Sequence, residues 1–455
     1  MSILTATNPF TANVIKQYPA LNAEQVSERI GDARNAFAQW SSTSIAERAK
    51  VLRAVATKIR ENKQHLAELM AQEMGKPIKE GEAEVEKAAG CAEHYAEHAH
   101  AYLASQTLPS DASHSYICYQ PLGTLLGILP WNAPVWLAFR YLVPALMAGN
   151  TCVIKHDPNV PASAQAIVDT FLVPGAPANI VVNLPINTPQ IEAVIRDPRI
   201  VGVSFTGSSA AGRKVAAIAG SEIKPVVLEL GGSDPCIVMA DADLDKAADI
   251  ATLSRIINAG QSCIAAKRII VEASVYEEFT ERLRQRLAKL TLGDPLQRET
   301  DIGPLARADL RDNLASQVTQ TLDAGARCVF QSEVPAGDGF FYPVTLLADV
   351  SPDMCAFREE TFGPVMVVTA AENIDQALQL ANDTDYGLGA AIWSSNADYI
   401  QRAINELQAG QVAVNGIVKT DSRLPSGGIK GSGIGRELGP QGIREFVNAK
   451  QVWIK

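Results

Sequence analysis

The fold is decided by the stretch from 124 to 155, which reads TLLGILPWNAPVWLAFRYLVPALMAGNTCVIK. Two short apolar runs near its ends, Leu125–Leu129 and Thr151–Ile154, are typical of buried strands. Pro130 and Pro134 place a turn after the first run, and the apolar segment that follows is long enough for a helix. A strand, a helix and a second strand in this order predict a parallel sheet with helical crossovers.

The same region raises the alternative of a membrane-spanning helix, because residues 112–139 contain no Lys, Arg, Asp or Glu. A spanning helix requires about 20 mostly apolar residues in one helix. Pro121, Pro130 and Pro134, with Gly127 among them, oppose such a helix. We therefore expect a buried strand, turn and helix here, and no membrane segment. The N-terminal residues also lack the basic and apolar regions of a signal peptide.

The alternation continues downstream of this stretch. Strands are predicted at Ile180–Val182, Val201–Phe205 and Val226–Leu230, with helices over 161–172 and 209–219. Upstream, the first hundred residues are predicted to be helical. The first helix is predicted to begin after a capping pair, Asn22 and Gln25. A second helix contains the apolar positions between 51 and 59, and a third spans residues 78–104.

The second half of the chain repeats the pattern. Strands are predicted at Ile237–Met239 and Arg268–Val271, and helices over 244–258 and 275–290. The glycine-rich segment 420–440 is predicted to be a loop. The sequence therefore predicts an α/β protein with two α/β units.

Composition excludes several classes of protein. The 455 residues allow two or three domains, and 47% hydrophobic residues indicate a globular chain. With 40 Lys and Arg against 50 Asp and Glu, the net charge of −10 disfavours a nucleic-acid binder. Seven scattered cysteines without a CxxC pair disfavour disulfides or a cysteine-rich zinc site, so we expect a cytoplasmic protein. His94, Glu97 and His98 match a zinc-binding pattern, but a polar helix surface explains them better and no metal is expected.

Three side chains are candidates for chemistry. Cys263 falls in a loop or at a helix start, where a thiolate would be favoured by a helix N-terminus, although most free cysteines are simply buried. Glu229 ends an apolar strand, and burial there would raise its pKa and make it a base near neutral pH, unless it faces solvent. Asn132 is held in a proline-bounded turn, where its amide could donate to an oxyanion or be an ordinary turn residue.

A strand followed by small residues and a helix, as at Thr206-Gly207-Ser208, is the geometry that places a phosphate at a helix N-terminus. The GxGxxG fingerprint is missing, so this signal is weak alone. Lys155, just after its strand, could contact a phosphate or a ribose.

The combination of motifs is more specific than any one of them. The chain carries in order Pro-Trp-Asn (130–132), Thr-Gly-Ser (206–208), Glu-Leu-Gly-Gly (229–232), the cysteine loop, Glu-Glu-Thr-Phe-Gly-Pro (359–364) and the late glycine-rich loop. Over essentially its whole length it resembles the aldehyde dehydrogenase superfamily, and within it the short bacterial succinate-semialdehyde dehydrogenases. The resemblance implies NAD- or NADP-dependent oxidation of succinate semialdehyde to succinate through a cysteine thiohemiacetal and thioester.

The resemblance also implies roles for individual residues. Cys263 would attack the aldehyde, Asn132 would bind the oxyanion, Glu229 would activate water, and Glu437 would assist proton relay. The residues expected to bind the cofactor are Trp131, Lys155, Gly207, Ser208, Leu230, Glu360 and Phe362. Pro158 stands where NAD-preferring relatives often carry Glu, so NADP is permitted as well as NAD.

Substrate choice rests on fewer residues. Arg140 is expected to pair with the distal carboxylate, because an unpaired Arg between apolar neighbours would be costly. Arg423 is a second candidate. Many relatives with this substrate have a further Arg where this chain has Ile257, and Ser426 replaces the usual Phe, which leaves the preferred chain length open.

Alternatives within this fold are a dehydrogenase for glutarate semialdehyde or a neutral aldehyde, and a coenzyme-A-acylating enzyme, against which Glu229 argues. A catalytically silent binding protein and an esterase are also considered.

The implied fold has two Rossmann-like domains, a cofactor-binding domain (1–104 and 122–230) and a catalytic domain (231–420). A β extension (105–121 and 440–455) would pair with another subunit, giving a homo-oligomer, a dimer or a tetramer.

Overall fold

The stretch that decides the fold forms the predicted strand, helix and strand. In the computed structural model, which describes residues 3–455, these are β5 (Thr124–Leu129), α5 (Pro134–Met147) and β6 (Thr151–His156). The two strands are parallel neighbours, and every residue of α5 is buried. Pro134 occupies the first turn of α5, where its missing N–H is not needed by the helix.

The first sheet has six strands in the order β17-β9-β8-β5-β6-β7. Its other members are β7 (Val181–Asn183), β8 (Ile200–Thr206), β9 (Val226–Glu229) and the antiparallel edge strand β17 (Gly433–Ile434). All strands predicted in this half of the chain therefore form. The sheet is parallel apart from β17, which returns from the late glycine-rich segment.

Helices cover both faces of the first sheet. On one face pack α2 (Ile45–Glu61), α3 (Lys63–Met74), α4 (Ile78–Tyr102), α5 and α6 (Pro161–Asp169). On the other lie α1 (Ala23–Ser41), α7 (Ile191–Arg196) and α8 (Ser209–Ser221). The capping pair forms, since the Asn22 side chain accepts from Gln25 N at 2.9 Å. The sequence did not predict α3, α7 or the hairpin of β1 (Ile3–Thr7) and β2 (Val14–Pro19).

The second sheet has seven strands in the order β12-β13-β14-β11-β10-β15-β16, parallel except for β12. Its strands are β10 (Asp234–Val238), β11 (Ala266–Glu272), β12 (Arg327–Gln331), β13 (Thr345–Ala348), β14 (Val365–Ala371), β15 (Gly389–Trp393) and β16 (Gln411–Val414). Its helices are α9 (Leu244–Ile256), α10 (Tyr276–Leu287), α11 (Ala308–Asp323), α12 (Cys355–Arg358), α13 (Ile374–Asn382) and α14 (Ala397–Glu406). The predicted second α/β unit is confirmed.

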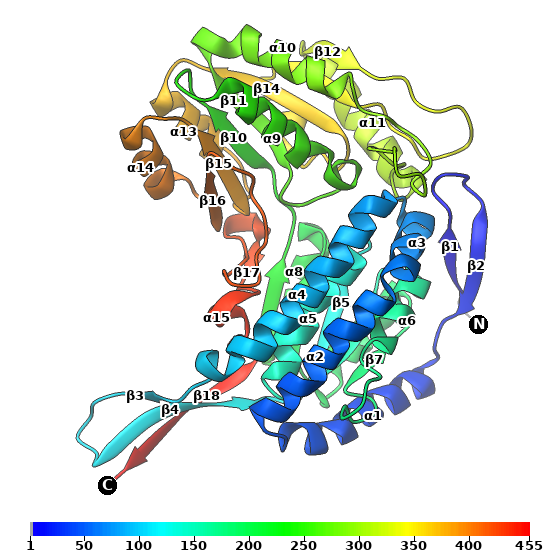
Figure 1. Ribbon diagram of the computed structural model, residues 1–455, viewed down its shortest axis with the longest axis vertical. Coiled ribbons are helices and arrows are strands. Elements are labelled where there is room, and N and C mark those ends of the chain that lie inside the picture. The colour runs from blue at the N-terminus through cyan, green and yellow to red at the C-terminus, as the bar shows by residue number, and fades with distance from the viewer. Residues whose placement is uncertain (1–2) are drawn as a thin grey trace.

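A three-stranded sheet projects from the first unit, at the lower left of Figure 1. It joins β3 (Gln106–Thr107), β4 (His114–Pro121) and β18 (Val447–Ile454), and β18 pairs with β4 along eight residues. These are the segments expected to form the oligomerisation extension. A short helix, α15 (Gly439–Gly442), precedes β18.

Among the described residues, no helix is both long and apolar enough to cross a membrane. The apolar stretch between 112 and 139 is divided between β4, β5 and the buried α5. Pro121, Pro130 and Pro134 therefore interrupt the apolar stretch, as the sequence suggested.

Candidate active site

A cavity of about 590 Å³ lies between the two α/β units. The carboxyl ends of β5, β6 and β8 open into it, which is where parallel sheets bind ligands. Its lining includes all but one of the residues expected to bind the cofactor: Trp131, Lys155, Gly207, Ser208, Leu230, Glu360 and Phe362. Pro158 does not line it, and the neighbouring Asp157 does.

Cys263 reaches this cavity from a turn that precedes β11. Just before the turn, Asn258, Ala259 and Gly260 adopt left-handed φ angles of 56°, 53° and 75°. For the two non-glycine residues this conformation is strained, which is common beside active sites. Lys267 stabilises the turn by donating to the carbonyls of Ser262 (2.8 Å) and Cys263 (2.7 Å). Cys263 therefore lies in a loop, as one interpretation expected, and the alternative of a helix start is wrong.

The pKa of the Cys263 thiol lies above its ordinary value. Burial raises its pKa to about 12, while the charges of Arg140 and Lys267 oppose the shift. The expected help from a helix N-terminus is missing because no helix begins there. To act as a nucleophile, the thiol must therefore give its proton to a nearby base.

Asn132 lies beside the cysteine loop. Its Nδ2 donates to the Gln261 carbonyl at 3.0 Å, and Asn258 Nδ2 donates to the Asn132 carbonyl at 2.8 Å. A side-chain amide has two N–H donors, so one remains available to a ligand. The amide and Cys263 line the same cavity, which is the arrangement needed to stabilise an oxyanion formed on the sulfur-bound carbon.

Glu229, Arg140 and Glu437 form one buried cluster. Arg140 Nη2 donates to Glu229 Oε2 at 3.0 Å, and Arg140 Nε donates to Glu437 Oε2. All three side chains are at most 6% exposed. The assumption that Arg140 would be unpaired without a ligand is therefore wrong, because two carboxylates of the chain already pair with it. Neither carboxylate faces bulk solvent, which removes the alternatives of a solvent-facing Glu229 and an exposed loop Glu437.

Glu229 has the properties of a base near neutral pH. Burial raises the pKa of Glu229 to about 7, although the Arg140 guanidinium opposes the shift. Its second oxygen, Oε1, is buried without a hydrogen-bond partner among the described residues. A free carboxylate oxygen with a raised pKa can accept a proton from water or from a thiol.

The Glu-Glu-Thr-Phe-Gly-Pro segment closes the cavity from the second unit. Glu360 Oε1 accepts from Gly232 N at 3.1 Å and pairs with Lys267 at 3.3 Å. A Cβ on Gly231 would lie 2.4 Å from Glu360 Oε2, so a larger residue at this position would displace the Glu360 carboxylate. The Phe362 ring packs edge-on against Trp131, with ring centres 5.9 Å apart.

The cavity fits an anionic dinucleotide. The Ser208 side chain caps α8 by accepting from Ala211 N at 3.3 Å, so the positive end of this helix faces the lining. Lys155 and Lys214 add cationic groups, and burial lowers the pKa of Lys155. Thr206 Oγ1 is buried there without a partner among the described residues, as expected of a group that contacts a ligand.

Sequence reasoning missed several buried polar residues that shape the site. Arg255 donates to the carbonyls of Thr361 (2.7 Å), Gly363 and Val365 (2.5 Å), and so holds the segment that carries Glu360. Lys267 is equally buried. The available signal was the presence of cations in otherwise apolar elements, which require partners when buried.

Arg423 lies elsewhere. It is exposed, pairs with Asp421 at 2.8 Å, and lines a second cavity of about 480 Å³ together with Lys87 and Thr420.

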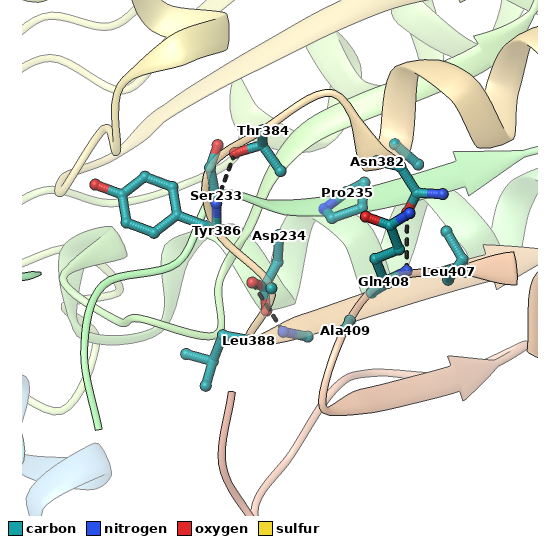
Figure 2. A pocket seen from close by; sticks show the side chains of 14 residues that line it. Ser233, Asp234, Pro235, Asn382, Thr384, Tyr386, Leu388, Leu407, Gln408 and Ala409 are labelled. Carbon is teal, nitrogen blue, oxygen red and sulfur yellow. Dashed lines mark hydrogen bonds between the residues drawn. The ribbon is translucent and has the colours of Figure 1, made fainter. Parts of the chain in front are cut away.

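A third cavity, beside Ser233 and Asp234, has a volume of about 10 Å³ (Figure 2), which suits about one water molecule. Among the described residues, no cluster of three His, Cys, Asp or Glu could hold a metal ion.

Comparisons with known proteins agree with this geometry. The family model described as the aldehyde dehydrogenase family matches residues 2–452. The chain is 45% identical to a probable succinate-semialdehyde dehydrogenase (NADP+) of Synechocystis over 454 residues, covering all of both chains. It is 44% identical to succinate-semialdehyde dehydrogenase (NADP+) 1 of Mycobacterium ulcerans over 457 residues, 99% of each chain.

Solved structures match equally well. A succinic semialdehyde dehydrogenase from Streptococcus pyogenes in complex with NADP+ superimposes with a TM-score of 0.96 at 34% identity, covering 99% of each chain. A structure of Gox0499, described for its cofactor and substrate selection, has a TM-score of 0.98 at 38% identity over the whole of both chains. Since the family model and these relatives span nearly the full sequence, the chain belongs to the aldehyde dehydrogenase family.

Proposed function

We propose that this chain oxidises succinate semialdehyde to succinate with NADP+ or NAD+. The observation that carries the proposal is that Cys263 and Asn132 line one large cavity with the residues expected to bind the cofactor, while the charge of the buried Glu229 acts on the Cys263 thiol. The names of the relatives from Synechocystis and Mycobacterium ulcerans support the same substrate and NADP+.

In the first step, Cys263 Sγ forms a bond to the aldehyde carbon, and the thiol proton passes to Glu229 Oε1, directly or through water. The oxygen of the resulting thiohemiacetal accepts from the free N–H of Asn132 and from the backbone N–H of Cys263. Because burial raises the pKa of the thiol, this step depends on the base.

When bound, the cofactor would supply the acceptor for the hydride of the thiohemiacetal carbon, which would leave a thioester on Cys263. Lys155, Ser208 and Glu360 are proposed to bind and orient the cofactor, with Trp131 and Phe362 excluding water beside it. Glu229 releases the thiol proton to water, and as a carboxylate it then takes a proton from the water whose oxygen attacks the thioester carbon. The C–S bond breaks, the acid leaves, and the thiol is restored.

Arg140 and Glu437 support this cycle in our proposal by holding Glu229. Arg140 bonds one oxygen of Glu229 and leaves the other free. The expectation that Arg140 binds the substrate carboxylate remains a prediction, and so does a contribution from Arg423.

A kinetic panel tests the proposed function. Succinate semialdehyde, glutarate semialdehyde and butanal are each assayed with NADP+ and NAD+ by the absorbance of the reduced cofactor. A kcat/KM for succinate semialdehyde that clearly exceeds that for butanal supports the proposal. Equal turnover of butanal would reject the carboxylated substrate, and turnover only with added coenzyme A would point to the acylating reaction, against which Glu229 argues.

We further propose that the chain forms a homo-oligomer, either a dimer or a tetramer, and that it is located in the cytoplasm. The exposed edge of β18 supports the first part, because unpaired strand edges are usually covered. The seven cysteines, which form no disulfide, support the second. The domain boundaries predicted at 104, 121, 230 and 420 are retained as proposals.

A further inference from the structure

Lys267 is a fully buried cation to which the proposed reaction assigns no role. It belongs to β11 and follows Cys263 by four residues. An ammonium group has three N–H donors. Two of them donate to the carbonyls of Ser262 (2.8 Å) and Cys263 (2.7 Å), and Glu360 Oε1 lies 3.3 Å from the nitrogen. All three partners therefore belong to the cysteine loop or to the segment that closes the cavity.

The hydrogen bond to Ser262 fixes the peptide unit that carries the Cys263 N–H. The Ser262 carbonyl and the Cys263 N–H belong to one planar peptide, and no peptide bond among the described residues is cis. In a trans peptide the C=O and the N–H point in opposite directions. Because the carbonyl points toward the Lys267 ammonium group, the N–H must point away from it.

The Cys263 N–H is available to a ligand. Among the described residues, Cys263 N donates to no backbone or side-chain acceptor. Asn132 contacts the same loop, since its Nδ2 donates to the Gln261 carbonyl at 3.0 Å. That carbonyl belongs to the peptide unit directly before the one that carries the Cys263 N–H. The two proposed oxyanion donors are therefore held by neighbouring peptide units, and their residues line one cavity.

The charge of Lys267 also strengthens this backbone donor. A cation at the carbonyl oxygen draws electron density from the peptide nitrogen through the peptide resonance, and hydrogen bonds in a chain polarise one another. The Cys263 N–H is then a better partner for a negative oxygen. The same charge acts on the thiol: burial raises the pKa of Cys263, and the charges of Arg140 and Lys267 oppose this rise.

Two further contacts hold the ammonium group in place. Glu360 Oε1 also accepts from Gly232 N at 3.1 Å, and Glu360 is the one carboxylate ion-paired with Lys267 among the described residues. A Cβ on Gly232 would lie 2.7 Å from the Cys263 carbonyl oxygen, so the Glu-Leu-Gly-Gly segment packs directly against the cysteine loop. The Lys267 side chain is only 1% exposed, so bulk water does not replace these partners.

We propose that Lys267 is a positioning residue that orients and polarises the Cys263 N–H toward the oxyanion formed on the sulfur-bound carbon. The proposal rests on the proposed function and deepens it. In the step concerned, Cys263 Sγ forms a bond to the carbonyl carbon, the π electrons of the carbonyl move to its oxygen, and the thiol proton passes to Glu229. Lys267 acts through the peptide alone and exchanges no proton.

The test compares two reactions of the same thiolate in the absence of cofactor. p-Nitrophenyl acetate acylates a thiolate through a tetrahedral intermediate with a negative oxygen, from which p-nitrophenolate leaves. Iodoacetamide alkylates the thiolate by displacement of iodide and places no charge on a carbonyl oxygen. Both rates are followed on Cys263 by mass spectrometry of its peptide. Their ratio reports the oxyanion contribution, since a change in loop access or in the thiol pKa alters both rates alike.

Lys267→Met should lower the ratio of acylation to alkylation about 10- to 100-fold, which is less than the roughly 100- to 1,000-fold cost of removing an oxyanion donor. Asn132→Ala removes such a donor and should lower the same ratio. Lys267→Gln keeps an N–H donor without the charge, so its loss should be intermediate. This variant carries the test if Lys267→Met does not fold.

Arg268→Met is the matched control. Arg268 is the next residue of β11 and is equally buried, but its hydrogen bonds go to backbone carbonyls outside the cysteine loop, those of Ser233, Leu380 and Ala381. The substitution removes a buried cation without a contact to Cys263, so the ratio should stay close to that of the unaltered protein.

An unchanged ratio in the Lys267 variants, or an equal loss in Arg268→Met, would overturn the proposal. The two ideas fail separately. An unaltered protein that p-nitrophenyl acetate does not acylate at Cys263 rejects both, whereas a ratio that survives in Lys267→Met rejects only the role of Lys267.

Discussion

At the scale of single residues, the Glu229 carboxyl determines how activity depends on pH. Burial raises the pKa of Glu229 to about 7, and a base is active only when deprotonated. We expect kcat to increase as pH rises through about 7 and to level off above it. Glu229→Gln should remove this rise and lower kcat about 100- to 10,000-fold, as measured by steady-state rates across neutral pH. Glu437→Gln is the control and should retain the rise, because Glu229 keeps its carboxyl; a rise that persists in Glu229→Gln would assign it to another group.

Arg140 is predicted to act through its two carboxylates. Arg140→Met would leave Glu229 and Glu437 buried without a cation, and removing one partner of a buried ion pair costs about 3–5 kcal/mol. We therefore expect a lower free energy of unfolding in chemical denaturation, and a lower kcat with succinate semialdehyde and butanal alike. A selective increase in KM for succinate semialdehyde, with normal stability and normal butanal turnover, would instead support the carboxylate-binding role suggested by the sequence.

At the scale of elements, α4 holds the oxyanion turn and the cysteine loop together. Glu84 Oε1 accepts from Val135 N and Trp136 N, both at 2.9 Å, and so caps α5 directly after Asn132. Its other oxygen pairs with the buried Lys76. One turn earlier on α4, Glu80 Oε2 accepts from Asn258 N at 2.7 Å, in the strained segment before Cys263. The geometry of Asn132 and Cys263 thus depends on carboxylates of one helix.

Glu84→Ala tests this dependence. It removes the acceptor of two backbone N–H groups and leaves Lys76 buried without its partner, so we expect a loss of about 3–5 kcal/mol in the free energy of unfolding. The kcat should also fall as Asn132 loses its fixed position. Glu86→Ala, on the exposed side of the same helix, is the control and should cost at most about 1 kcal/mol, because its ion pairs are solvent-exposed. Equal effects of the two substitutions would contradict a special role for Glu84.

The elements that the sequence predicted are those with a clear apolar pattern. The run Leu125–Leu129 and the helix after Pro134 form as expected, because burial on all sides leaves an unbroken apolar signal. By contrast, α3 follows α2 after the single residue Asn62, and no proline or glycine marks the boundary. Strand β2 is mostly exposed and lacks the alternation that identifies a strand. Local patterns cannot reveal such elements.

At the scale of the whole molecule, the site depends on contacts between distant parts of the chain. Cys263, Asn132 and Glu229 were candidates from their local sequence and received their roles from the family motifs, and the fold brings Cys263 and Asn132 to one cavity. The partners of Arg140 were not foreseen, because Glu437 lies 297 residues away and no sequence pattern links the two. The expectation for Arg140 assumed that no carboxylate of the chain would reach it, and only the packing of the late glycine-rich segment against the first sheet shows otherwise.

The projecting sheet is where we expect subunits to meet. Strand β18 is an outer strand of that sheet, with Trp453 44% and Ile454 47% exposed, and an uncovered apolar edge favours pairing with another chain. Light scattering after size exclusion should therefore give a mass of at least twice 48.6 kDa. Trp453→Glu combined with Ile454→Glu should shift the mass toward that of one chain, because buried charges oppose association. Ile223→Glu, at a position that is 94% exposed elsewhere on the first unit, is the control and should leave the mass unchanged. A mass of 48.6 kDa for the unaltered protein would reject the oligomer, since the edge would then be stable without a partner.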